Sequence, residues 1–188
     1  MTAASPEPGI ALRFAGPSDA LCIGVLATQV FLDTYATDGI RPSLAREVQH
    51  HLSADAIARL LADPATVFIV AERTGHLIGF AQVTIGATHE RAGPDATVEL
   101  DRLYVQRAFA GKGVGTMLLG RAEELARARG AGALWLTAWV GNRRALAFYA
   151  RRGYVDAGAT TYVFENEQHE NRVLVRPLDR DHAAGATA

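Results

Sequence analysis

The sequence predicts a mixed α/β fold with one central sheet and helices on both of its faces. Three observations support this prediction. Helix-capping residues open several segments in the first third of the chain. β-Branched runs separated by a tight turn follow in the middle. Towards the end of the chain, apolar strands and amphipathic helices alternate.

The bulk composition is typical of a single globular domain. The chain has 188 residues, of which 49% are hydrophobic and 21% are charged. Residues 1–9 and 179–188 have little to bury, so we expect one domain over 10–178 between two unstructured ends. The formal net charge of −1 provides no positive field for nucleic acid. Because the sequence shows no signal peptide and no apolar run of about 20 residues, we expect a cytoplasmic protein with no membrane partner.

The cysteine, histidine and tryptophan residues are expected to be structural. Cys22 stands in an apolar run, where we expect a buried thiol. The six histidines have no metal-ligand spacing with cysteine or acidic residues, so no metal is expected. Trp135 and Trp139 are expected to pack in the core or at the edge of the sheet.

The first half of the chain is expected to form a strand, three helices and a hairpin. The strand is expected at 10–14 and the helices at 19–33, 42–51 and 53–62. The hairpin is expected to join strands 66–72 and 77–85. Residues 34–40 are expected to form a loop, because Asp38-Gly39 is typical of a turn.

The second half is expected to alternate strands with helices. The strands are expected at 96–105, 133–138, 160–165 and 171–178, and the helices at 113–130 and 142–152. The helix at 113–130 has one apolar stripe with charges opposite, as a helix packed on a sheet requires. The strand at 133–138 is almost wholly apolar, which is typical of a strand covered on both faces.

A glycine-rich loop, Ala110-Gly111-Lys112-Gly113-Val114-Gly115, lies between a strand and a helix. The N-terminus of a helix offers unpaired N–H groups, and glycines allow a phosphate to approach them closely. The loop has neither the Lys-Ser/Thr pair of a P-loop nor the third glycine of a dinucleotide-binding fingerprint. Taken alone, the loop is therefore either a pyrophosphate cradle of another kind or a plain glycine turn.

Two motifs resemble the GNAT superfamily of N-acetyltransferases. Leu103-Tyr104-Val105, the glycine loop and Leu118-Leu119 are similar to the acetyl-CoA motif of that family. The segment 142–154 resembles its Asn-x-x-Ala-x-x-Phe-Tyr-x-x-x-Gly-Phe pattern. The resemblance implies a mixed, mostly antiparallel sheet of about seven strands. It also implies direct transfer of an acetyl group from acetyl-CoA to an amine.

The resemblance implies a cofactor site on the loop, the strand before it and the later helix. The residues implied are Leu103, Tyr104, Val105, Ala110, Gly111, Lys112, Gly113, Val114, Gly115, Thr116, Asn142, Ala145, Phe148 and Tyr149. The family usually has Arg or Gln where this chain has Ala110, so one side-chain contact to phosphate is missing. Lys112 or Arg107 is a candidate substitute, unless the backbone alone suffices.

Direct transfer needs a proton donor for the leaving thiolate, and the resemblance gives this role to Tyr149. A phenol with a pKa of about 10 suits such a donor. The alternative is that Tyr149 only packs its helix against the sheet. Asn142 is expected to cap the same helix, and the resemblance also implies that it contacts CoA.

The reaction also needs a proton acceptor for the amine, and Glu99 is the first candidate. It lies six residues before Val105, the offset at which some family members place a glutamate base. Asp101 and an ordered water chain are the alternatives. Alternation along the strand puts Glu99, Asp101 and Leu103 on one face, with Arg102 and Tyr104 on the other.

For the acceptor amine, the family places its substrates between the first helices and the central strands. The corresponding candidates here are Phe31, Asp33, Tyr35 and Asp38, which offer acids and aromatic rings to a cationic amine. A solvated helix end explains them equally well. The segment resembles the branch that contains polyamine and small-amine acetyltransferases.

The sequence is compatible with more than one function. The acceptor is a small amine in the first hypothesis and a protein N-terminus or lysine in the second. A third hypothesis is a catalytically idle acyl-CoA-binding module. Family members are often dimers, which leaves a homodimer open.

Overall fold

The computed structural model describes residues 9–164 and 167–178. Apart from Gly9, the two ends that were expected to be unstructured, 1–9 and 179–188, lie outside the described residues. The strands within these residues are β1 (Ile10–Phe14), β2 (Thr66–Arg73), β3 (His76–Ile85), β4 (Val98–Val105), β5 (Ala133–Trp139), β6 (Val155–Phe164) and β7 (Glu167–Pro177). The α-helices are α1 (Ala20–Tyr35), α2 (Pro42–His51), α3 (Ala54–Ala62), α4 (Val114–Ala128) and α5 (Arg143–Arg151).

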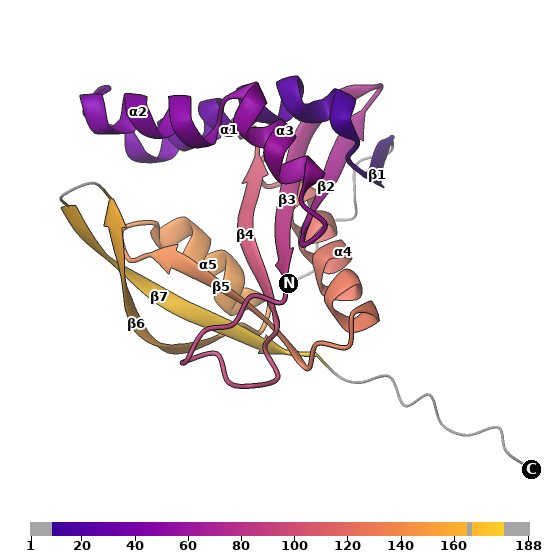
Figure 1. Cartoon of the computed structure of the whole chain (residues 1–188), viewed down its shortest axis with the longest axis vertical. Helices are drawn as coiled ribbons and strands as arrows, with labels where there is room; N and C mark the ends of the chain where they lie inside the picture. Colours follow the sequence, from indigo (N-terminus) through magenta and orange to yellow (C-terminus); the bar gives the residue numbers. More distant parts are fainter. Residues whose placement is uncertain (1–8, 165–166, 179–188) are drawn as a thin grey trace, which may run out of the picture.

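These strands form one sheet of seven in the order β1-β2-β3-β4-β5-β7-β6. Every neighbouring pair is antiparallel except β4 and β5, which are parallel (Figure 1). The expected mixed, mostly antiparallel sheet of about seven strands is therefore confirmed.

Helices cover both faces of this sheet, as expected. On one face, α1 packs with Phe68 and Val70 of β2 in a common core. On the other face, α4 packs with Ile69 of β2. Because successive residues of a strand point to opposite faces, the uninterrupted apolar run in β2 supplies both cores.

The parallel strands β4 and β5 diverge soon after they begin. They pair only at Val98 with Leu134 and at Glu99 with Trp135. Beyond Glu99, β4 keeps its pairing with β3, whereas β5 pairs with β7 (Figure 1). Within the described chain, the backbone of β4 from Asp101 to Val105 thus has no strand partner on its β5 side.

A β-bulge interrupts β4 just before this open stretch. Val83 of β3 pairs with Leu100, but the preceding Gln82 pairs with Arg102. Asp101 is therefore the extra residue, opposite no residue of β3. An extra residue of this kind reverses the alternation of side chains beyond it.

The bulge overturns the expected division of side chains between the two faces of β4. Leu100 and Leu103 both pack in the core on the α4 face. Glu99 and Arg102 instead line a cavity together with Tyr104, which packs in the core on the α1 face. The expectation that Glu99 faces away from Arg102 and Tyr104 was wrong, because strict period-two counting ignores the bulge.

Some element boundaries also differ from the expectation. Helix α1 continues to Tyr35, so the segment expected to be a loop begins as helix. β6 and β7 begin earlier than expected, at Val155 and Glu167, and form a long hairpin. The expected strand end at Glu165 lies outside the described residues.

The side chain of Cys22 is exposed, which corrects the expectation of a buried thiol. Helix α1 buries Ala20, Ile23, Gly24 and Ala27, which recur with helical spacing on one face. Position 22 falls outside this stripe, so the apolar run around it does not imply burial.

Candidate active site

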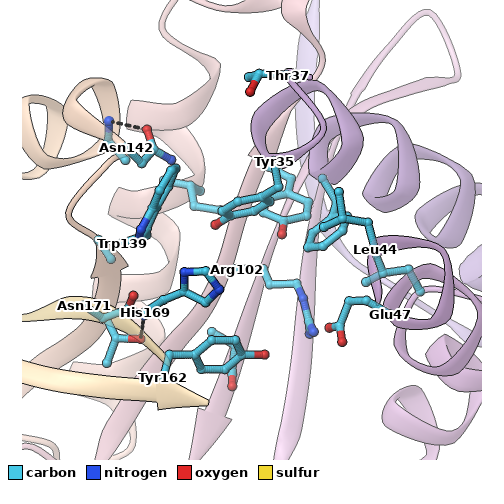
Figure 2. A pocket seen from close by; sticks show the side chains of 18 of the residues that line it. Tyr35, Thr37, Leu44, Glu47, Arg102, Trp139, Asn142, Tyr162, His169 and Asn171 are labelled. Carbon is cyan, nitrogen blue, oxygen red and sulfur yellow. Dashed lines mark hydrogen bonds between the residues drawn. The ribbon is translucent and has the colours of Figure 1, made fainter. Parts of the chain in front are cut away.

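A cavity of about 510 Å³ opens between the α1–α2 region and the diverging strands β4 and β5. Glu99 and Tyr104 of β4 line it, as does Tyr149 of α5. Helix α2 contributes Glu47, and β6 contributes Tyr162 from the opposite side (Figure 2). The cavity thus joins the site expected for the catalytic groups to the site expected for the acceptor.

Carboxylates and one cation line the β4 side of this cavity. Thr84 Oγ1 donates a 2.7 Å hydrogen bond to Asp101 Oδ2. Arg102 donates a 2.5 Å hydrogen bond to Oε1 of the buried Gln82. These bonds fix the side chains of the bulged residue, Asp101, and of Arg102, which follows it. Glu99 lies partly buried in the same lining.

The surroundings of Glu99 disfavour its ionised form relative to a carboxyl group in water. Burial raises the pKa of Glu99 to about 7, and the nearby negative charge of Asp101 adds to this shift, while Arg102 opposes it. Loss of hydration also raises the pKa of Asp101, which the hydrogen bond from Thr84 opposes. Glu99 is therefore poised to take up and release a proton near neutrality.

Tyr149 reaches the cavity from α5, and Asn142 caps the N-terminus of this helix. The Asn142 side chain accepts a 3.1 Å hydrogen bond from the backbone N–H of Ala145, which confirms the expected cap (Figure 2). The Tyr149 side chain is only 8% exposed and packs edge-on against Phe148 and Tyr154. Burial raises the pKa of Tyr149 above its ordinary value, so its phenol stays protonated at physiological pH.

The glycine loop begins α4 in the geometry that a cradle requires. Gly111 and Gly113 have φ values of 80° and 86°, in the left-handed region that side chains disfavour. Gly113 is the N-cap of α4. A Cβ at Gly115 would lie 3.7 Å from the Phe148 ring, so α5 packs directly against this turn. Three of the six loop positions are glycines, so no Cβ at these positions blocks a ligand from the N–H groups at the start of α4.

Lys112 of this loop and Arg152 beside it each lie over an aromatic ring. Lys112 Nζ lies 5.7 Å from the centroid of the Phe109 ring. The guanidinium of Arg152 lies 5.6 Å from the centroid of the Phe148 ring and donates a hydrogen bond to Thr116 Oγ1. Arg152 was not among the residues that the sequence indicated for this site.

The acceptor side of the cavity is largely aromatic. The rings of Phe31 and Tyr35 lie 4.9 Å apart, and those of Tyr35 and Trp139 lie 5.9 Å apart. Trp139 in turn contacts His169 of β7 at 6.5 Å. These four residues form an aromatic arc from α1 across β5 to β7, and all four line the cavity. Figure 2 shows Tyr35, Trp139 and His169 of this arc.

Three of the four acceptor residues expected from the sequence reach this cavity. Phe31 and Tyr35 are one helical turn apart on the same face of α1, and Asp38 follows in the loop. Asp33 is exposed and does not line the cavity, because position i+2 of a helix points away from positions i and i+4.

The sequence did not indicate several residues that line the acceptor side. Glu47, Tyr162 and His169 come from elements far apart in the chain, and only the fold brings them together. Tyr162 and His169 are opposite each other in the β6–β7 hairpin. Trp135 is buried as expected, but Trp139 lines the cavity and is not simply packed.

The described residues offer neither a membrane-spanning helix nor a metal-binding cluster. None of their helices is both long enough and apolar enough to cross a membrane. The same part of the chain contains no cluster of three or more histidine, cysteine or acidic side chains placed to hold a metal ion.

The chain is similar to known acetyltransferases in sequence and in fold. Residues 32–154 match the acetyltransferase (GNAT) family. The chain is 30% identical over 135 residues to an uncharacterised N-acetyltransferase of Mycobacterium tuberculosis. This alignment covers 72% of this chain and 82% of that protein. The chain is also 32% identical over 109 residues to a streptothricin acetyltransferase of Streptomyces lavendulae. That alignment covers 58% of this chain and 54% of the relative.

One solved structure with a similar fold contains coenzyme A. It is the PaiA N-acetyltransferase of Thermoplasma acidophilum, which superposes with a TM-score of 0.68 at 20% identity. The match covers 90% of this chain and 99% of that one. At this level of identity, the similarity concerns the fold.

Proposed function

This chain belongs to the acetyltransferase (GNAT) family and is an acetyl-CoA-dependent N-acetyltransferase, and on that premise we propose that it acetylates a primary amine of a small cationic molecule. The observation that carries the proposal is the shared cavity, which is lined both by Glu99 of β4 and by Tyr149 of α5. Together they offer a proton acceptor and a proton donor in one site.

The residues of the chain fit acetyl-CoA at two places. The loop from Ala110 to Gly115 exposes N–H groups where a phosphate would approach, because Gly111 and Gly113 adopt positive φ. The unpaired side of β4 from Leu103 to Val105 offers main-chain groups to the pantetheine arm. When bound, acetyl-CoA supplies the acetyl group as a thioester that an amine attacks directly.

Glu99 accepts a proton from the acceptor amine in this proposal. An amine is cationic at neutral pH and must lose a proton before it can act as a nucleophile. A carboxyl group with a pKa of about 7 is well matched to this task at neutral pH. Asp101, which is fixed to Thr84, supplies the negative charge that helps to raise the Glu99 pKa.

Tyr149 donates its phenolic proton towards the departing sulfur in this proposal. Its side chain is buried and lines the cavity, and it is protonated at working pH. Asn142 and Ala145 start the helix that carries Tyr149, and both line the same cavity. We assign the cofactor contacts expected from the sequence to these residues and to Phe148, which packs on Gly115.

The acceptor is held by the aromatic arc and by nearby carboxylates in this proposal. Aromatic faces and carboxylates both attract a positively charged group. The arc supplies Tyr35 and Trp139, and Glu47 projects into the cavity from α2 (Figure 2). Side chains from α2 and from the β6–β7 hairpin line this end, and a cavity of about 510 Å³ is of a size that suits a small acceptor.

The test is release of free CoA thiol from acetyl-CoA in the presence of candidate acceptors. The panel contains polyamines, amino acids, short peptides and streptothricin, which the name of one relative gives as its substrate. We expect turnover with a polyamine or another small cationic amine, and loss of turnover in Glu99→Gln. Turnover with peptides alone would contradict the small-molecule proposal, and confirmed acetyl-CoA binding without any turnover would favour an idle binding module.

A further inference from the structure

The proposed phosphate cradle lacks a polar side chain at position 110, where the family usually has Arg or Gln. Ala110 provides only a methyl group there. Arg107 is exposed on the short helical turn before the loop, and Lys112 lies over the Phe109 ring. A diphosphate carries at least two negative charges, so backbone N–H groups alone leave much of that charge without a counter-ion.

Arg152 brings a cation to this cradle from a distant part of the sequence. It follows α5, whose Phe148 ring lies against Gly115 at the start of α4. The Arg152 guanidinium lies over that ring and donates to Thr116 Oγ1 in the first turn of α4. Its position is thus fixed by one aromatic contact and one hydrogen bond.

Arg152 is the C-cap of α5, but its guanidinium reaches the N-terminal end of α4, where an anion is favoured. The N-terminal end of a helix carries partial positive charge, so a guanidinium at the first turn of α4 is repelled rather than stabilised there. In the part of the chain that the structure describes, Arg152 makes its side-chain contacts with a hydroxyl and a ring and not with a carboxylate. A bound diphosphate would convert this repulsion into attraction for both the helix and the guanidinium.

We propose that Arg152 binds the diphosphate of acetyl-CoA and replaces the side chain that is missing at Ala110. This inference rests on the proposed cofactor site at the glycine loop. Arginine suits the role because its planar fork can donate to Thr116 and to a phosphate oxygen at the same time. Thr116 then acts as a positioning residue that holds the guanidinium at the start of α4.

The experiment measures the dissociation constant of CoA by calorimetry for the parent protein and for Arg152→Met. Loss of a charge-assisted contact to phosphate should raise the dissociation constant about tenfold or more. Arg151→Met is the matched control, since Arg151 is the exposed preceding residue and should leave the constant unchanged. Arg152→Gln can still donate to Thr116 but has no charge, so it should weaken binding as Arg152→Met does.

Shortened ligands separate the diphosphate from the rest of the cofactor. Dephospho-CoA keeps the diphosphate and should show the same loss in Arg152→Met, whereas the KM for acetyl-pantetheine, which has no phosphate, should not change. An equal loss with acetyl-pantetheine would mean that Arg152 is only structural, and a loss confined to CoA would assign it to the 3′-phosphate; either result overturns the proposal. Failure of the parent protein to bind CoA would instead reject the proposed cofactor site.

Discussion

Glu99 is held where burial and the charge of Asp101 both disfavour its ionised form. Because the proposed reaction needs ionised Glu99, kcat/KM should rise with pH and level off above an inflection near 7. Glu99→Gln should lose about 100-fold or more in kcat, together with this acidic limb. The measurement is the pH dependence of kcat/KM for the amine, corrected for the ionisation of the amine itself.

The matched variant for this pH profile is Asp101→Asn. It removes the neighbouring negative charge, so the pKa of Glu99 should fall and the inflection should move to lower pH while turnover persists. If Asp101→Asn abolishes the acidic limb and Glu99→Gln retains it, Asp101 is the proton acceptor. A profile that neither variant alters would point to the water chain.

The same residue should reduce stability at neutral and higher pH. Glu99 has a pKa of about 7 when folded, raised from an ordinary 4.5, so the folded chain holds more protons than the unfolded chain between these values. Its contribution to the free energy of unfolding therefore falls as pH rises through this window. Glu99→Gln should match the parent near pH 4.5 and exceed it by about 2–3 kcal/mol at pH 8. Urea unfolding at the two pH values tests this, and a pH-independent difference would contradict it.

Tyr149 and Tyr154 are buried neighbours whose hydroxyl groups face different surroundings. Tyr149→Phe should lower kcat about 100-fold and leave the dissociation constant of CoA unchanged, because the phenol is needed only when the thiolate departs. Tyr154→Phe is the control: its hydroxyl donates to the buried Glu123, so it should lose about 1 kcal/mol of stability and keep its turnover. Steady-state kinetics, calorimetry and urea unfolding of both variants give the comparison. Equal turnover in the two variants would assign Tyr149 to packing alone.

At the scale of single elements, local signals in the sequence predicted what local physics decides. Asn142 caps α5, and Gly113 begins α4, because caps and positive φ depend on a few adjacent residues. The bulge at Asp101 was not predictable in this way, since it depends on the register between β3 and β4. The alternation rule therefore assigned Arg102 to the wrong face, even though both strands were identified.

The glycine loop gives a prediction at this scale. Gly113 has a φ of 86°, so Gly113→Ala should cost about 1–2 kcal/mol of stability or shift the loop, and should weaken CoA binding in either case. Gly120→Ala in the same helix is the control, because its added Cβ meets no atom within 4 Å. That variant should gain up to about 1 kcal/mol from helix propensity and bind CoA normally. Thermal unfolding and calorimetry test both variants, and unchanged CoA binding in Gly113→Ala would remove the loop from the cofactor site.

At the scale of the whole molecule, the active-site cavity is a product of topology. Its lining comes from α1 and α2 near one end of the chain and from β5 to β7 near the other, which meet across the splayed strands (Figure 1). The sequence identified the donor side of this cavity through two compact motifs. Glu47, Tyr162 and His169 on the acceptor side belong to no motif, so only the fold reveals them.

The aromatic arc that joins the two ends of the chain gives the last prediction. Trp139 is its central member, in contact with Tyr35 of α1 and His169 of β7. If the arc holds a cationic acceptor, Trp139→Ala should raise the KM for the amine about tenfold, because a desolvated cation–π contact and the burial of the ring are both lost. Trp139→Phe keeps an aromatic face and should retain most of the affinity. Steady-state kinetics with each substrate varied in turn provide the measurement. A rise confined to the KM for acetyl-CoA would place Trp139 in the cofactor site and would leave the acceptor to be held by the carboxylates alone.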